Sequence, residues 1–176
     1  MVVYLFNFNT CQDLALLEIG DQQCSPLYAF GPNIRNEYIF HYVVSGKGVV
    51  MLQPSGEKGQ NILSETIEVK AGEGFLIEPH TAHMYRADEN DPWHYIWIVF
   101  TGLSVPSYLR ACGLTRNNPV FYPQSYAHAV SSRVREPLRQ ILGHPDASKA
   151  FIIGQLNAGA AQNVAAAEPA PAERRP

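Results

Sequence analysis

The chain has 176 residues and carries 13 Lys and Arg against 16 Asp and Glu, a formal net charge of −3. This length favours one domain around one hydrophobic core, and a hydrophobic fraction of 46% excludes a disordered or collagen-like chain. The mild acidity argues against a polyanion as the main partner, because neutralising phosphates requires clustered Lys and Arg.

The amino-terminal segment and the cysteines indicate a soluble, cytoplasmic protein without a membrane span. MVVYLFNFNT has neither the basic start nor the long apolar run of a signal peptide. Three cysteines, Cys11, Cys24 and Cys112, match no zinc or redox spacing, which is typical of a reducing compartment. The segment from Met1 to Asn9 is expected to form a first strand or, alternatively, an arm that packs over a pocket.

Between Tyr38 and Gly102, short apolar segments separated by Gly, Pro, Asn and Asp predict five or six antiparallel strands. EYIFHYVVSG and GVVMLQ are expected to pair as a hairpin around the glycine turn at residues 45–48. The further strands are expected in NILSETIEVK, FLIEP, HMYRAD and HYIWIVFTG. The lack of intervening helical patterns excludes alternating strand and helix units and favours an all-β barrel or sandwich.

Helical patterns follow Gly102. A short helix is expected from the N-cap Ser104 to Gly113, and PVFYP predicts an extended piece after it. Residues 125–142 predict a helix that Pro137 should kink or divide, and a further helix is expected from Ser148 to Leu156. One stripe of the longer helix could form a dimer interface or pack on the barrel, and consists of Val130, Val134, Leu138 and Leu142.

Strand alternation sorts the unusual side chains onto two faces. One face of the last strand carries Trp93, Tyr95, Trp97 and Val99, and the other carries His94, Ile96, Ile98 and Phe100. In the earlier strand, Arg35 and His41 share a face that is distinct from the apolar and aromatic face of Tyr38, Phe40, Tyr42 and Val44. His94 is expected at the surface or in an interface.

An ordered set of motifs supports a family resemblance. Gly31-Pro32, Arg35, Tyr38, His41 and Gly46-Lys47-Gly48 are followed by Ala71-Gly72-Glu73-Gly74-Phe75, Pro79, His83 and Tyr85, and then by Asp91-Pro92-Trp93, Tyr95, Trp97, Phe100 and Gly102. Over residues 20–142 this order resembles the amino-terminal, effector-binding domain of AraC-type bacterial transcription regulators. The resemblance implies a mainly β fold, a cupin-like double-stranded jelly roll followed by carboxy-terminal helices.

The resemblance also implies a domain organisation and a function. Residues 1–123 are expected to form the jelly roll, residues 124–157 a helical dimerisation segment, and residues 158–176 an Ala/Pro linker or disordered tail. The protein would bind a sugar or a similar small polar effector and form a homodimer. Its contact with DNA would require a helix-turn-helix domain absent from this chain, because the sequence either ends within the interdomain linker or belongs to a paralogue without that domain.

The expected ligand site combines a cation, imidazoles and aromatic faces. Its ligand-binding residues are predicted to be Arg35, His41, His83, Tyr85, Trp93, Tyr95 and Trp97. A guanidinium offers a fork of donors to hydroxyl or carboxylate oxygens, and indole or phenol rings stack on the C–H face of a sugar. The Trp and Tyr side chains could instead be ordinary core residues.

We expect no metal, no cofactor and no catalytic residue. The first metal-binding motif of cupin enzymes, H-x-H-x-x-x-E, falls here on Asn33, Arg35 and Ile39, none of which supplies the expected ligand. The carboxylates of Glu73, Glu78 and Asp88 are expected to be solvated, and Cys112 to be a structural thiol. The alternatives are a stand-alone cupin enzyme, such as a sugar isomerase or a metal-dependent oxygenase, and a scaffold module without a ligand.

Overall fold

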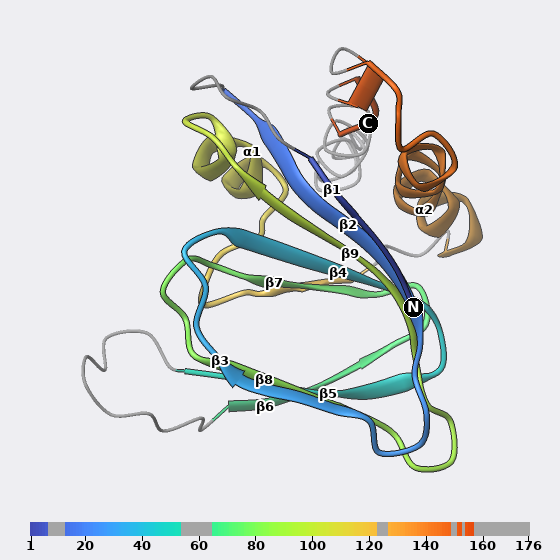
Figure 1. The fold of residues 1–176 in the computed structure, drawn as a ribbon. Coiled ribbons are helices and arrows are strands. Elements are labelled where there is room, and N and C mark those ends of the chain that lie inside the picture. The colour runs from blue at the N-terminus through green and yellow to red at the C-terminus, as the bar shows by residue number, and fades with distance from the viewer. Residues whose placement is uncertain (7–12, 54–64, 123–126, 149–150, 153, 157–176) are drawn as a thin grey trace, which may run out of the picture.

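Two antiparallel sheets face each other in the computed structural model, which describes residues 1–6, 13–53, 65–122, 127–148, 151–152 and 154–156 (Figure 1). The six-stranded sheet has the order β1 (Val2–Leu5), β2 (Ala15–Gln23), β9 (His94–Thr101), β4 (Tyr38–Ser45), β7 (Gly74–Ile77) and β10 (Val120–Phe121). The four-stranded sheet has the order β3 (Ala29–Asn33), β8 (His83–Ala87), β5 (Lys47–Leu52) and β6 (Glu65–Lys70). This architecture confirms the mainly β, cupin-like jelly roll that the sequence predicted.

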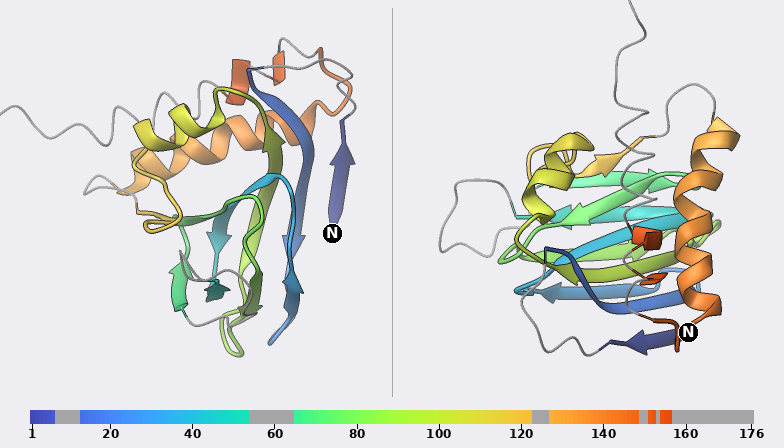
Figure 2. Two further views of the ribbon diagram at one scale, coloured as in Figure 1. Left: turned by 90° about the vertical axis from the view of Figure 1, so that its left-hand side faces the viewer. Right: turned by 90° about the horizontal axis from the view of Figure 1, so that it is seen from above.

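The six-stranded sheet is buried on both faces. Helices α1 (Val105–Ala111) and α2 (Ala127–Gly143) cover the face that points away from the four-stranded sheet (Figure 2). One hydrophobic cluster lies between this sheet and the helices and includes Phe40, Ile98 and Leu138. A second cluster lies between the two sheets and includes Val43, Phe75 and Tyr95. Alternating side chains of one strand therefore serve two cores; the strand parity predicted the two faces, but not that both are buried.

The expected hairpin is wrong, although both of its strands form. β4 pairs with β7 and β9, whereas β5 pairs with β6 and β8, so the chain crosses from one sheet to the other at Gly46. Gly46 has a φ of 72°, and a Cβ there would lie 2.5 Å from the carbonyl oxygen of Pro92. A glycine turn between two apolar strands is a hairpin signal that also suits this crossover, because both require a left-handed residue.

The helical segment differs from the sequence prediction in two details. Helix α2 continues through Pro137 and is not divided there. Ser104 occupies the N-cap position of α1, but its side chain makes no capping hydrogen bond. Val134 and Leu138 are buried against the six-stranded sheet, so this part of the predicted stripe packs on the jelly roll, whereas the Val130 side chain lies outside the described residues.

Glu73 is buried, contrary to the expectation that it is solvated. It lies in the turn between β6 and β7 with only 8% of its surface exposed, and its carboxylate accepts a hydrogen bond of 2.9 Å from the backbone N–H of Lys70. The carboxylate can be buried in this turn because it is hydrogen-bonded to the backbone N–H of Lys70. The expected tail, residues 158–176, and the end of the expected arm, residues 7–9, lie outside the described residues.

No helix in the described part of the chain is both long enough and apolar enough to cross a membrane.

Candidate ligand-binding site

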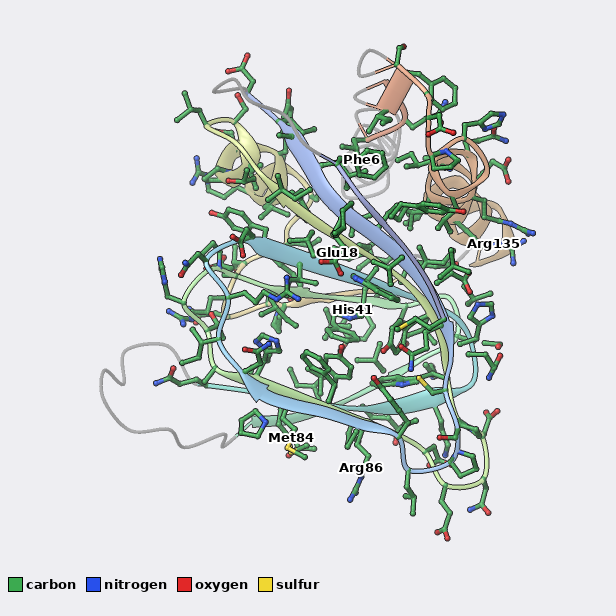
Figure 3. The ribbon with its side chains drawn as sticks, viewed as in Figure 1. Phe6, Glu18, His41, Met84, Arg86 and Arg135 are labelled. Atoms are coloured by element: carbon green, nitrogen blue, oxygen red, sulfur yellow. The ribbon has the colours of Figure 1, made fainter. Side chains whose placement is uncertain are left out.

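A cavity of about 210 Å³ lies between the two sheets. Side chains from β1, β2, β3, β4, β8 and β9 line it, and Arg35 reaches it from the connection between β3 and β4. Figure 3 shows Glu18 and His41 pointing into the space between the sheets, whereas Met84 and Arg86 of β8 point away from it. Along β8, alternate residues therefore point into the cavity (His83 and Tyr85) and away from it (Met84 and Arg86).

Six of the seven predicted site residues line this cavity: Arg35, His41, His83, Tyr85, Tyr95 and Trp97. The seventh, Trp93, is fully buried but does not line the cavity. Its ring stacks on Phe75 at a centroid distance of 5.9 Å, within the cluster between the sheets. Trp93 has the predicted inward parity, but it lies ahead of the first residue of β9 and packs in the core.

Gly20 of β2 determines where the Trp97 indole lies. The two residues are partners in the pairing of β2 with β9, and a Cβ on Gly20 would lie 2.2 Å from two atoms of the indole ring. The ring can lie over the β2 backbone because Gly20 has no side chain. In this position Trp97 Nε1 donates a hydrogen bond of 2.7 Å to Glu18 Oε1.

Glu18 points inward because β2 is irregular at this point. The pairing with β9 shifts register between Leu16 and Glu18, and Leu16 and Ile19 consequently both contribute to the cluster under the helices. Neither Glu18 nor strand β2 was predicted from the sequence. The segment ALLEIGDQQ has no regular alternation of polar and apolar residues that would have indicated a strand with two different faces.

Arg35 lies at the rim of the cavity and forms an ion pair with Glu18. The distance from Arg35 Nη1 to Glu18 Oε2 is 3.5 Å, and the side chains are 38% and 16% exposed, respectively. The backbone carbonyl of Arg35 accepts a hydrogen bond of 2.7 Å from the N–H of His80, which fixes the loop that carries the guanidinium. Glu18 therefore bridges the indole and the guanidinium.

His41 is a buried, neutral imidazole on the cavity wall. It is only 2% exposed and stacks on Phe75 with ring centroids 4.5 Å apart. Burial lowers the pKa of His41 to about 3, and the nearby His83 contributes to the lowering. Its Nδ1 has no hydrogen-bond partner among the described residues.

His83 offers a second buried nitrogen with a defined role. Its Nδ1 lies 3.0 Å from the carbonyl oxygen of Thr81, which can only accept, so Nδ1 carries the proton. Burial lowers the pKa of His83 and favours the neutral ring, so that Nε2 is an acceptor. Nε2 also has no partner within the described chain. Leaving such a group unpaired costs about 1–3 kcal/mol, which a bound ligand or water would offset.

Tyr85 and Tyr95 complete the polar wall as neutral phenols. Burial is the main cause that raises the pKa of each, and their side chains are hydrogen-bonded to each other. Both rings contact His41 edge-on, with centroids 5.0 Å from the imidazole. The site thus combines hydroxyl and guanidinium donors with imidazole and carboxylate acceptors on an aromatic wall.

Two further features bear on the alternatives. Within the described residues, no three His, Cys, Asp or Glu side chains are grouped so that they could hold a metal ion. A second cavity of about 100 Å³ lies between the six-stranded sheet and the helices, and its walls are mostly apolar, including Phe40, Ile98 and Leu138. Compared with this apolar cavity, the cavity between the sheets has the polar groups that could orient a hydrophilic ligand.

Comparison with known proteins gives consistent results. Residues 17–153 match the family model described as the AraC-like ligand binding domain. The chain is 32% identical over 102 residues to the Msm operon regulatory protein of Streptococcus mutans, and the matched region covers 58% of this chain and 33% of that protein. It is 33% identical over 87 residues to the raffinose operon transcriptional regulatory protein RafR of Pediococcus pentosaceus, covering 49% and 28%. It is 27% identical over 81 residues to the lactose operon transcription activator of Staphylococcus xylosus, covering 46% and 29%. The chain thus spans about a third of the length of these relatives.

Proposed function

We propose, since the chain belongs to the family of AraC-like ligand binding domains, that it is the effector-sensing part of a transcription regulator and binds a sugar between its two sheets. Two of the relatives are named for the operons of raffinose and lactose, both of which are sugars. The buried, unpaired imidazole nitrogens of His41 and His83 carry the proposal from the structure. Together with the ring of Trp97 they line one cavity, His41 and Trp97 from the six-stranded sheet and His83 from the four-stranded sheet.

A sugar matches this set of groups. Its hydroxyl groups can donate to His83 Nε2 and accept from Arg35, and its C–H face can stack on the indole of Trp97. Binding pairs polar groups that are otherwise unsatisfied, which discriminates well between ligands because each unmatched buried group costs about 1–3 kcal/mol. We assign ligand contact to Arg35, His41, His83, Tyr85, Tyr95 and Trp97, and leave Trp93 to the core.

A thermal-shift screen of lactose, raffinose, other saccharides and sugar acids tests this function. A ligand at 100 times its Kd stabilises the folded state by about 2.7 kcal/mol. The proposal predicts that at least one saccharide raises the Tm by several degrees. It is contradicted if no saccharide does so, while the protein melts cooperatively.

We further propose that the chain is not an enzyme and returns its ligand unchanged. The relatives are named as regulators, and no catalytic pair of carboxylates was found in the sequence. The alternative is a cupin enzyme such as a sugar isomerase or metal-dependent oxygenase. Conversion of a bound sugar, or one equivalent of transition metal in protein purified without a His-tag, would support that alternative.

The output of binding is proposed to pass to the helical segment, residues 124–157, and through residues 158–176 to a helix-turn-helix domain outside this chain. Residues 1–123 are then the sensing jelly roll. β1 lies at the cavity, since Met1 and Val3 line it, and the bound sugar would stabilise this edge strand. To switch a regulator almost completely, the ligand must prefer one state by about 10⁴-fold. Unchanged hydrogen exchange of β1 on ligand binding would exclude its participation.

We also propose a cytoplasmic homodimer. Val134 and Leu138 are buried within the chain, so the interface would have to use other surfaces, such as the exposed side chains of Leu103, Tyr108 and Tyr122. Sedimentation equilibrium at high micromolar concentration tests the dimer. A strict monomer would contradict it.

A further inference from the structure

We propose that Glu18 makes the cavity selective for neutral, hydroxyl-rich ligands and excludes anionic ones such as sugar acids and sugar phosphates. This inference rests on the proposed sugar-binding function and names its substrate class. Glu18 is a specificity-determining residue in this account, and it is also a positioning residue for the Trp97 ring.

Glu18 already pairs with the guanidinium that an anionic ligand would need. Of the side chains that line the described cavity, those of Arg35 and Glu18 carry the formal charges, and they form an ion pair with 3.5 Å between Nη1 and Oε2. An anionic ligand would have to compete with Glu18 for Arg35. It would also bring a second negative charge close to a carboxylate that is only 16% exposed, where solvent screens the repulsion weakly.

The cavity also presents acceptors that require a donating ligand. His83 Nε2 is an acceptor, because its Nδ1 is bonded to the Thr81 carbonyl, and the Glu18 carboxylate is acceptor-only. A hydroxyl group donates as well as accepts, whereas a carboxylate or a fully ionised phosphate only accepts. The hydroxyl groups of a neutral polyol therefore satisfy both acceptors, and an anionic group placed there satisfies neither.

The Glu18 carboxylate cannot turn away from the cavity without losing partners. Oε1 accepts the indole N–H of Trp97 at 2.7 Å while Oε2 faces Arg35. The indole is itself held over Gly20, since a Cβ there would overlap it. Glu18 therefore fixes the ring that is proposed to stack on the sugar, and that ring fixes Glu18.

Glu18→Gln removes the charge and keeps the shape. The amide oxygen can still accept from Trp97 Nε1, and Arg35 is released from its ion pair. Asp21→Asn is the matched control, because Asp21 lies on the same strand and its carboxylate binds His94 Nε2 at 2.8 Å outside the cavity. Both variants are made in the full chain, and circular dichroism melting establishes that each is folded.

The probes are D-galactose and D-galacturonate, which differ by a carboxylate at C6, together with lactose and raffinose. Isothermal titration calorimetry is expected to show that the unmodified chain binds galacturonate at least tenfold more weakly than galactose. Glu18→Gln is expected to reduce this ratio at least tenfold, and Asp21→Asn to leave it unchanged. The comparison in the unmodified chain tests the selectivity even if Glu18→Gln does not fold.

The outcomes separate the two proposals. Equal binding of galactose and galacturonate by the unmodified chain, or an undiminished preference in folded Glu18→Gln, overturns the role of Glu18 and leaves the sugar-binding function intact. Failure of every neutral sugar to bind overturns the proposed function, and the role of Glu18 with it.

Discussion

Neutral histidines inside the jelly roll make its stability depend on pH. The folded-state pKa of His41 is about 3, against an ordinary value of 6.5. The His41 imidazole is therefore protonated below pH 6.5 in the unfolded chain, but only below about pH 3 in the folded chain. The contribution of neutral His41 to the free energy of unfolding is therefore complete above pH 6.5 and is lost as the pH falls from 6.5 to about 3.

We predict that the free energy of unfolding falls by about 2 kcal/mol between about pH 7.5 and about pH 5 because of His41 alone. His83 adds to the loss, since burial also lowers its pKa. Urea unfolding at the two pH values measures the difference. His41→Phe, which retains an aromatic ring against Phe75, should lose about 2 kcal/mol less than the unmodified chain. An equal loss in both proteins would refute the assignment of this proton to His41.

Trp97 is predicted to be essential for ligand binding. Trp97→Ala removes the stacking surface and should abolish the thermal shift caused by lactose or raffinose, whereas Trp97→Phe should retain part of it. The alanine variant should also be destabilised by about 3–5 kcal/mol, so its folding must be established first. Met84→Ala, on β8 but pointing away from the cavity, is the control. A full thermal shift in folded Trp97→Ala would place the ligand elsewhere.

Most of the cavity wall could be predicted from strand alternation. Parity places His41 and Trp97 on inward faces, and the structure brings them to one cavity. Glu18 could not be predicted in the same way, because a register shift precedes it and its partner Trp97 is 79 positions away. A bulge reverses the parity on which such predictions depend.

At the scale of elements, strands β4 to β9 could be predicted, but β2, β3 and the partners of the strands could not. Apolar runs and glycine turns located β4 to β9, because these signals are local. The choice between a hairpin and a crossover at Gly46 depends on contacts with residues such as Pro92, which is distant in the chain. Helix α2 tolerates Pro137, since Leu138 and Ile141 anchor it on the six-stranded sheet.

The path of β2 beneath Trp97 gives a prediction at this scale. Gly20→Ala should displace the indole, break its hydrogen bond to Glu18, destabilise the fold by about 1–3 kcal/mol and weaken sugar binding. Gly143→Ala is the control, because a Cβ at that glycine would meet no neighbouring side chain within 4 Å. Chemical denaturation and tryptophan fluorescence measure both effects. A Gly20→Ala protein as stable as the control, with unaltered sugar binding, would contradict the account.

At the scale of the whole molecule, the six-stranded sheet connects the ligand cavity with the helices. Its inward residues, such as His41 and Tyr95, line the cavity, and their neighbours Phe40 and Ile96 belong to the cluster under α1 and α2. A ligand that shifts β4 or β9 therefore acts on both cores at once, since close-packed interiors transmit strain. The sequence predicted the two faces but not that both are covered.

The most direct test of the central claim is to observe the imidazole nitrogens while a sugar is added. In ¹⁵N NMR titrations with lactose or raffinose, we predict a large change in the His83 Nε2 resonance and a change at His41. His144, which is exposed and does not line the cavity, should not respond. Saturating sugar binding that leaves the resonances of both His41 and His83 unchanged would contradict the assignment of the cavity between the sheets as the effector site.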